Sequence, residues 1–161
     1  MKLGIAIDDV QDAEMDLAKQ LVALAEHHHD EPDVYHTSLA RAHACAEHVW
    51  RLRPVVALYD AHAVDVEGAT TRGFIDTLLG AGSAVAHIPA TGLALLNDLR
   101  DTYVSAHRAE VSWIVLQQAA RAARDGELLA VVGTCVEEAE QTFKWLRTRI
   151  KESAPAALAS S

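Results

Sequence analysis

The chain has 161 residues, of which half are hydrophobic, two cysteines, and a formal net charge of −9 with a pI near 5.4. This length suits one domain with a sizeable core, so folding requires neither a disulfide nor a metal ion. An acidic chain without clusters of lysine or arginine offers little to nucleic-acid phosphates or to an anionic membrane surface. We therefore expect neither nucleic acid nor membrane as a partner.

The first residues predict no secretion signal, because a short apolar run ends at Asp8 and Asp9. Nowhere does an apolar window approach the length of a membrane span. Both cysteines, Cys45 and Cys135, fall on apolar helical stripes, where a thiol behaves as a small hydrophobic group. We expect a soluble cytoplasmic protein whose cysteines are buried and reduced.

Apolar residues recur every three or four positions in four long windows, which predicts an all-α protein. Asp8 and Asp9 can cap a first helix that runs to about His28. The pattern then breaks, and Pro32 suits the first turn of a second helix. We expect Pro54 to bend or end that helix.

The periodicity weakens between about residues 61 and 90, leaving room for one short helix over residues 71–79. A third helix is predicted over residues 91–124. Gly126 is placed to end it in a left-handed conformation, and a fourth helix follows at once. So short a link makes the last two helices antiparallel neighbours.

Two tight links and one long crossover between four helices are the connectivity of a ferritin-like four-helix bundle. The bundle would span residues 1–152, with residues 153–161 as a flexible tail. In bundles of this kind, carboxylates and imidazoles from facing helices hold two metal ions in the core. Each predicted helix offers residues of these types: Glu14; His43 and Glu47; His107 and Glu110; Glu137, Glu138 and Glu140.

Glu110 is the most informative candidate, because it lies between Ala106 and Trp113 on a predicted inward stripe. A buried carboxylate is costly unless it is paired or bound to a metal ion. Two interpretations stay open. Glu110 and His107 can both bind metal, or a hydrogen bond between these two residues, three apart on a helix, can satisfy both without metal.

Orientation separates the remaining candidates. His43 is expected to lean into the bundle, whereas Glu47 and His48 are expected at its rim. Glu138, rather than Glu140, is expected to face inward.

Consecutive histidines at the end of the first helix resemble a metal-binding tract, but neighbours on a helix point in different directions. We therefore expect His27, His28 and His29 to complement the helix dipole instead of converging on one ion. The three tryptophans lie at helical spacing on apolar flanks and are expected in the core: Trp50, Trp113 and Trp145.

Three stretches, at residues 31–52, 106–110 (AHRAE) and 136–142 (VEEAEQT), resemble the small ferritin-like bundles of the stress-associated YciF type. The resemblance extends from about residue 14 to residue 146. It implies a di-metal carboxylate protein that binds iron or manganese, or zinc, and it assigns the ligand roles to Glu14, His43, His107, Glu110 and Glu138. Two departures are His43 with Ala44, where the family tends to have glutamates, and Gln141 in place of a basic or ligating residue.

The leading hypothesis is a homodimer or larger oligomer that oxidises iron or handles peroxide in a stress response, with Tyr103 as a redox or hydrogen-bonding neighbour of the metals. The alternative is a non-catalytic bundle that kept the scaffold after its metal site degenerated and acts as a binding or assembly module. A third possibility is a helical partner for another protein that uses residues 61–89.

Overall fold

The structure is a computed structural model that describes residues 2–64, 71–82 and 91–159. All regular structure in these ranges is helical, which confirms the predicted all-α class. In chain order the elements are α1 (Leu3–His27), α2 (Pro32–Val56), the 3-10 helix η1 (Ala57–Tyr59), α3 (Thr71–Gly82), α4 (Gly92–Ala123) and α5 (Gly126–Ala159).

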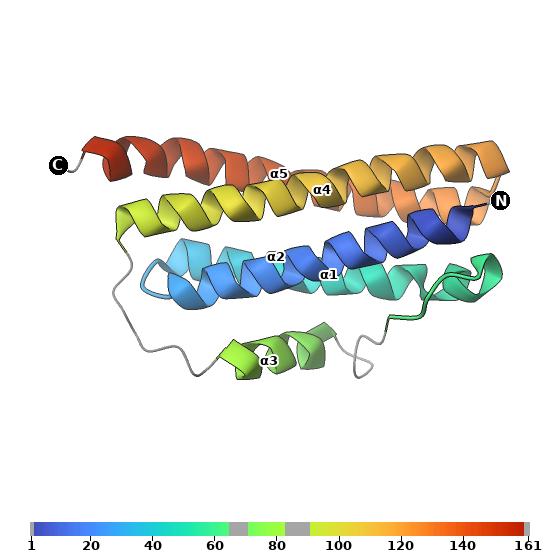
Figure 1. Ribbon diagram of the computed structural model, residues 1–161, viewed down its shortest axis with the longest axis horizontal. Coiled ribbons are helices and arrows are strands. Elements are labelled where there is room, and N and C mark those ends of the chain that lie inside the picture. The colour runs from blue at the N-terminus through green and yellow to red at the C-terminus, as the bar shows by residue number, and fades with distance from the viewer. Residues whose placement is uncertain (1, 65–70, 83–90, 160–161) are drawn as a thin grey trace.

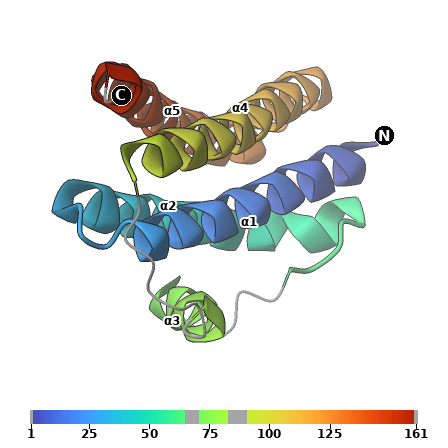
Figure 2. The ribbon, with the colours of Figure 1, turned by 60° about the vertical axis from the view of Figure 1, so that its left-hand side comes forward.

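The long helices form two antiparallel pairs that lie on one another (Figure 1). Helix α1 pairs with α2 and α4 pairs with α5, while α1 also packs on α4 and α2 on α5. Helix α3 contacts α1 and α2 on the side that faces away from α4 and α5, as Figure 2 shows. Because α4 begins at the opposite end of the bundle from the end of α2, these two helices run in the same direction.

Helix α1 begins at Leu3, five residues before the predicted cap at Asp8. The earlier start follows from packing, because Leu3, Ile7 and Val10 are all buried and extend the apolar periodicity toward the N-terminus. Gly4 is needed here, since a Cβ at this position would collide with the backbone carbonyl oxygen of Tyr59.

A hydrogen-bonded turn joins α4 to α5 at the end of the bundle where α1 begins and α2 ends. Arg124, rather than the predicted Gly126, adopts the left-handed conformation, with φ of 56°. Asp125 then caps α5 by accepting a hydrogen bond of 2.9 Å from the backbone N–H of Leu128. The same carboxylate accepts a hydrogen bond from the Tyr59 hydroxyl, which links the turn to the end of α2 and η1.

The apolar seam of α4 differs from the predicted seam at alternate positions. Leu99, Ala106 and Trp113 are buried as expected. The three-to-four spacing predicts Tyr103, Glu110 and Gln117 as the other seam residues. The residues that complete the observed seam lie one position earlier: Thr102, Ala109 and Leu116. Glu110 therefore lies at the edge of the seam, where its side chain is 25% exposed.

The ends of α2 and α5 compare differently with expectation. Helix α2 passes through Pro54 and ends two residues later at Val56, close to the predicted end. Helix α5 continues through the predicted flexible tail to Ala159. The added turns lie against the start of α4, because a Cβ on Gly92 would be in ordinary van der Waals contact with Ala157, 3.6 Å from its Cα atom. None of the described helices combines the length and the apolar character needed to cross a bilayer.

Candidate functional site: a buried ionic cluster

A buried histidine lies at the centre of the bundle. His48 is 2% exposed and Glu14 is 1% exposed. The Nδ1 atom of His48 lies 3.1 Å from Oε1 of Glu14, and its Nε2 atom lies 2.9 Å from Oε2 of Glu138. The prediction that His48 lies at the rim is therefore wrong, whereas the inward orientation of Glu138 is confirmed.

The burial of His48 follows from the position of α2, which packs against α1, α3 and α5. A helix with three neighbours buries a wider face than the single stripe predicted for it. His48 lies three residues after Cys45 and four before Leu52, so it shares a face with two buried residues.

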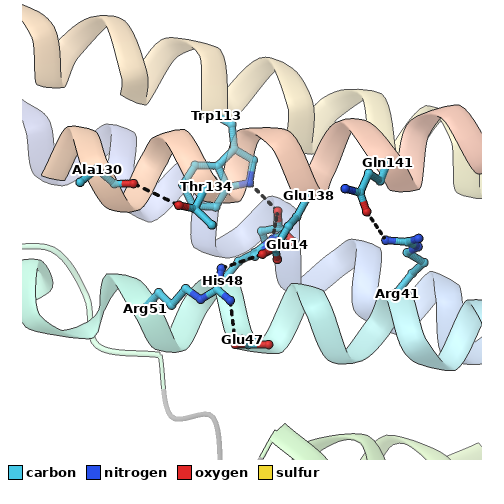
Figure 3. A network of polar contacts seen from close by, with 10 residues as sticks. All are labelled: Glu14, Arg41, Glu47, His48, Arg51, Trp113, Ala130, Thr134, Glu138 and Gln141. Carbon is cyan, nitrogen blue, oxygen red and sulfur yellow. Dashed lines mark hydrogen bonds and ion pairs between the residues drawn. The ribbon is translucent and has the colours of Figure 1, made fainter.

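All four long helices contribute to this ionic cluster, which we define as Glu14, His48, Arg51, Trp113 and Glu138 (Figure 3). The Trp113 indole N–H donates a hydrogen bond of 2.5 Å to Oε1 of Glu14. At the other end, Nη1 of Arg51 donates to Oε1 of Glu138 over 3.0 Å. The cluster thus extends from a fully buried tryptophan to a half-exposed arginine.

Arg51 also connects the cluster to the surface. Its Nη2 atom lies 2.7 Å from the exposed carboxylate of Glu47, one turn earlier on α2. The predicted rim position of Glu47 is confirmed.

The electrostatics favour a doubly protonated His48. Burial alone would lower the pKa of His48, but the hydrogen bonds and negative charges of Glu14 and Glu138 raise it above 6.5. Burial would raise the pKa of Glu138, yet its hydrogen bonds from His48 and Arg51 hold that pKa below 4.5. An imidazolium can donate from both ring nitrogens, which matches the two carboxylates on opposite sides of the ring.

Both cysteines are buried and free, as predicted. Burial raises the pKa of Cys45 well above its usual value, and the neighbouring Glu14 raises it further. Burial also raises the pKa of Cys135, to about 12. In this environment the two thiols stay protonated at neutral pH, so neither presents a thiolate.

The predicted metal ligands occupy three separate places. Glu14 and Glu138 meet at the ionic cluster, with His48 between them. His107 and Glu110 are joined by a contact of 3.1 Å between Nδ1 and Oε2 at the edge of α4, as in the metal-free alternative. His43 is half-buried and makes no hydrogen bond to the ionic cluster in the described part of the chain.

Tyr103 lies beside the His107–Glu110 pair and not beside the ionic cluster. Its ring stacks on Phe143 at 4.5 Å between centroids, and the His107 ring contacts the same phenyl ring at 5.3 Å. Gln141, one of the departures from the resembled family, accepts a hydrogen bond from Arg41 over 3.4 Å.

These residues do not fit a di-metal centre as the side chains are placed. The two nitrogens of His48 face different carboxylates. The side chains of Glu14, His48 and Glu138 therefore do not surround a common position that a metal ion could occupy. Helix α4 contributes only Trp113 to the ionic cluster as we define it, and the indole N–H of Trp113 is a hydrogen-bond donor and not a metal ligand. Among the residues that the structure describes, no three histidine, cysteine, aspartate or glutamate side chains stand ready to hold a metal ion.

One further side-chain expectation is corrected. Trp50 is 42% exposed instead of buried, and the guanidinium of Arg53 lies 4.9 Å from the centre of its ring.

The histidines at the end of α1 do not share one centre. His27 and His28 both contact Oδ2 of Asp98, at 3.3 and 2.7 Å, whereas His29 contacts the backbone oxygen of Glu26. His28 can approach the same carboxylate as His27 because α1 ends at His27 and His28 has non-helical dihedral angles.

The chain matches no protein-family model, and no curated protein and no solved structure is significantly similar to it. The ionic cluster is therefore interpreted from its own geometry and chemistry.

Proposed function

We propose that this chain is a non-catalytic helical bundle with ferritin-like connectivity that serves as an assembly module. In it, a protonated histidine takes the central position that metal ions occupy in di-metal bundles. One observation carries this proposal: both ring nitrogens of His48 are engaged, one by Glu14 and the other by Glu138.

The charges explain why a proton on His48 can balance the buried carboxylates without a metal ion. An imidazolium and the nearby Arg51 guanidinium supply the positive charge that the carboxylates of Glu14 and Glu138 require. The predicted iron oxidation or peroxide handling would require these carboxylates to leave His48 and turn toward a common centre. The placement of His107 and Glu110 at the edge of α4 supports the non-catalytic alternative.

An apolar stripe on the outer face of α4 supports the role in assembly. Nine large apolar side chains are exposed in the described part of the chain, and five of them lie on α4: Leu93, Val104, Val111, Ile114 and Val115. Val104 and Val111 are seven residues apart, the spacing that also relates the buried residues on the inner side of this helix. The same face also carries the exposed polar residues Arg100 and His107. An apolar stripe on the outside of a helical bundle is typical of a protein contact.

The partner that we propose for this stripe is a second copy of the chain. A two-fold axis midway between Val104 and Ile114, close to Val111, would place the α4 helices of two copies antiparallel, so that Val104 of each copy faces Ile114 of the other. Such self-complementary pairing is the commonest form of homo-oligomer.

Changing Val111 to glutamate should convert the dimer to a monomer without loss of helix content, because two carboxylates would lie close to each other in an apolar contact. Light scattering coupled to gel filtration measures the mass. The matched control is Leu58→Glu, which places the same charge at an exposed apolar residue of η1. A monomeric wild-type protein, or dissociation by Leu58→Glu alone, would refute the assembly through α4.

A further inference from the structure

A second feature of the molecule is a pocket of about 490 Å³ on the α1–α2 layer. This volume is in the range of sites that bind small organic molecules. Most of its described lining is apolar and comes from α2 and the segment that follows it: Val49, Trp50, Val56, Ala57, Ala63 and Val64.

The described lining of the pocket differs in charge from the chain as a whole. The formal net charge of the chain is −9, yet the described lining residues include no aspartate or glutamate. Arg53 is the single charged residue among them. It also forms no ion pair with a carboxylate in the part of the chain that the structure describes.

Arg53 and Trp50 form a combined surface at the pocket wall. The guanidinium lies 4.9 Å from the centre of the indole ring, a cation–π contact that holds the charge beside a flat apolar surface. Trp50 is 42% exposed, so its ring is accessible to a ligand. An exposed tryptophan beside an arginine that has no carboxylate partner among the described residues matches a ligand that is both aromatic and anionic.

Gln11 of α1 holds another part of the described lining in place. This side chain is 2% exposed, and its Nε2 atom donates a hydrogen bond of 3.0 Å to the backbone carbonyl oxygen of His62. The hydrogen bond fixes the segment that leads to Ala63 and Val64 against α1.

We propose that this pocket binds a small organic anion with a flat apolar body. The apolar body would lie on Trp50 and Val49, and its carboxylate or sulfonate would accept hydrogen bonds from the Arg53 guanidinium. This inference is independent of the proposed assembly through α4, because it rests on the other layer of the molecule.

Two fluorescent probes with similar aromatic bodies test the apolar contact and the charged contact with Arg53 separately. 8-Anilinonaphthalene-1-sulfonate carries an anionic group, whereas N-phenyl-1-naphthylamine is neutral. The anionic dye should bind at one site per chain, and Arg53→Gln should weaken its binding about tenfold, the loss of one charge-assisted hydrogen bond. Binding of the neutral dye should change by less than about twofold in the same variant.

Control variants make the result specific. Arg147→Gln removes an arginine that lies over the Phe143 ring outside the pocket, and it should leave both dyes unaffected. Trp50→Ala, checked for folding by circular dichroism, should weaken both dyes. Equal effects of Arg53→Gln and Arg147→Gln, or unchanged binding in Trp50→Ala, would overturn the proposal. Loss of dye binding in Val111→Glu alone would instead place the dye on α4 and also overturn it.

Discussion

Replacing His48 with alanine is expected to lower the free energy of unfolding by about 3–5 kcal/mol, the usual cost of breaking a buried ion pair. The substitution removes the positive charge beside the buried carboxylate of Glu14, which keeps the hydrogen bond from the Trp113 N–H but no longer has a cationic partner in the ionic cluster. Its other oxygen, Oε2, is already buried without a hydrogen-bond partner. Chemical denaturation at pH 6 measures the change directly.

The matched control is His43→Ala, which removes a half-buried histidine from the same helix. It should cost about 1 kcal/mol or less, because His43 does not neutralise a buried charge. A double variant, Glu14→Gln with His48→Gln, should recover part of the loss, since two neutral amides replace the ion pair. Equal destabilisation by His48→Ala and His43→Ala would show that the ionic cluster does not hold the core together.

Raising the pH should remove much of the same stabilisation without any mutation. The pKa of His48 is raised in the folded protein, so its contribution is complete below the unfolded value of 6.5 and is lost as the pH rises through the folded pKa. The pKa of Glu138 is lowered, so its contribution is complete above 4.5 and is lost as the pH falls through its folded pKa. The cluster is therefore most stabilising between pH 4.5 and 6.5.

Denaturation curves from pH 6 to about 9 test this pH dependence. Stability should fall more steeply in the parent protein than in His48→Gln, and the two should approach each other at high pH. His62, whose pKa is raised by its hydrogen bond to Asp8, contributes in the same direction. Both proteins should therefore carry His62→Gln. Parallel pH curves for the two proteins would contradict the assignment of the raised pKa to His48.

Much of the fold could be predicted because its signals are local. The three-to-four spacing of apolar residues predicted the four long helices, and Pro32 marked the start of α2. The Thr91 side chain caps α4 by accepting a hydrogen bond from the N–H of Ala94, as its position next to the predicted helix start implies. The earlier start of α1 at Leu3 depends on packing against residues distant in the sequence, since Leu3 is buried and Gly4 lies against Tyr59.

The ionic cluster was harder to predict, because it depends on the rotation of each helix. The two possible seams of α4 share Ala106 and Trp113 and differ only in the residues between them. The observed seam uses Ala109, whereas the predicted seam used Glu110. The lower polarity of Thr102, Ala109 and Leu116 is the signal that favours the observed rotation.

His48 was misplaced for a related reason. A single stripe describes a helix with one buried face, whereas α2 contacts three other helices. A partial signal did exist, since Cys45 was correctly expected to be buried and His48 follows it by three residues. The pairing with Glu14 and Glu138 involves residues 34 and 90 positions away, which no local pattern reveals.

The most direct test of the central claim is the protonation state of His48, measured by nuclear magnetic resonance of its ring nitrogens in ¹⁵N-labelled protein. We expect Nδ1 and Nε2 both to carry protons at pH 6.5, with a titration midpoint above that value, the pKa of an unperturbed histidine. A neutral ring with a single protonated nitrogen at this pH, or a nitrogen bound to a metal ion, would contradict the account.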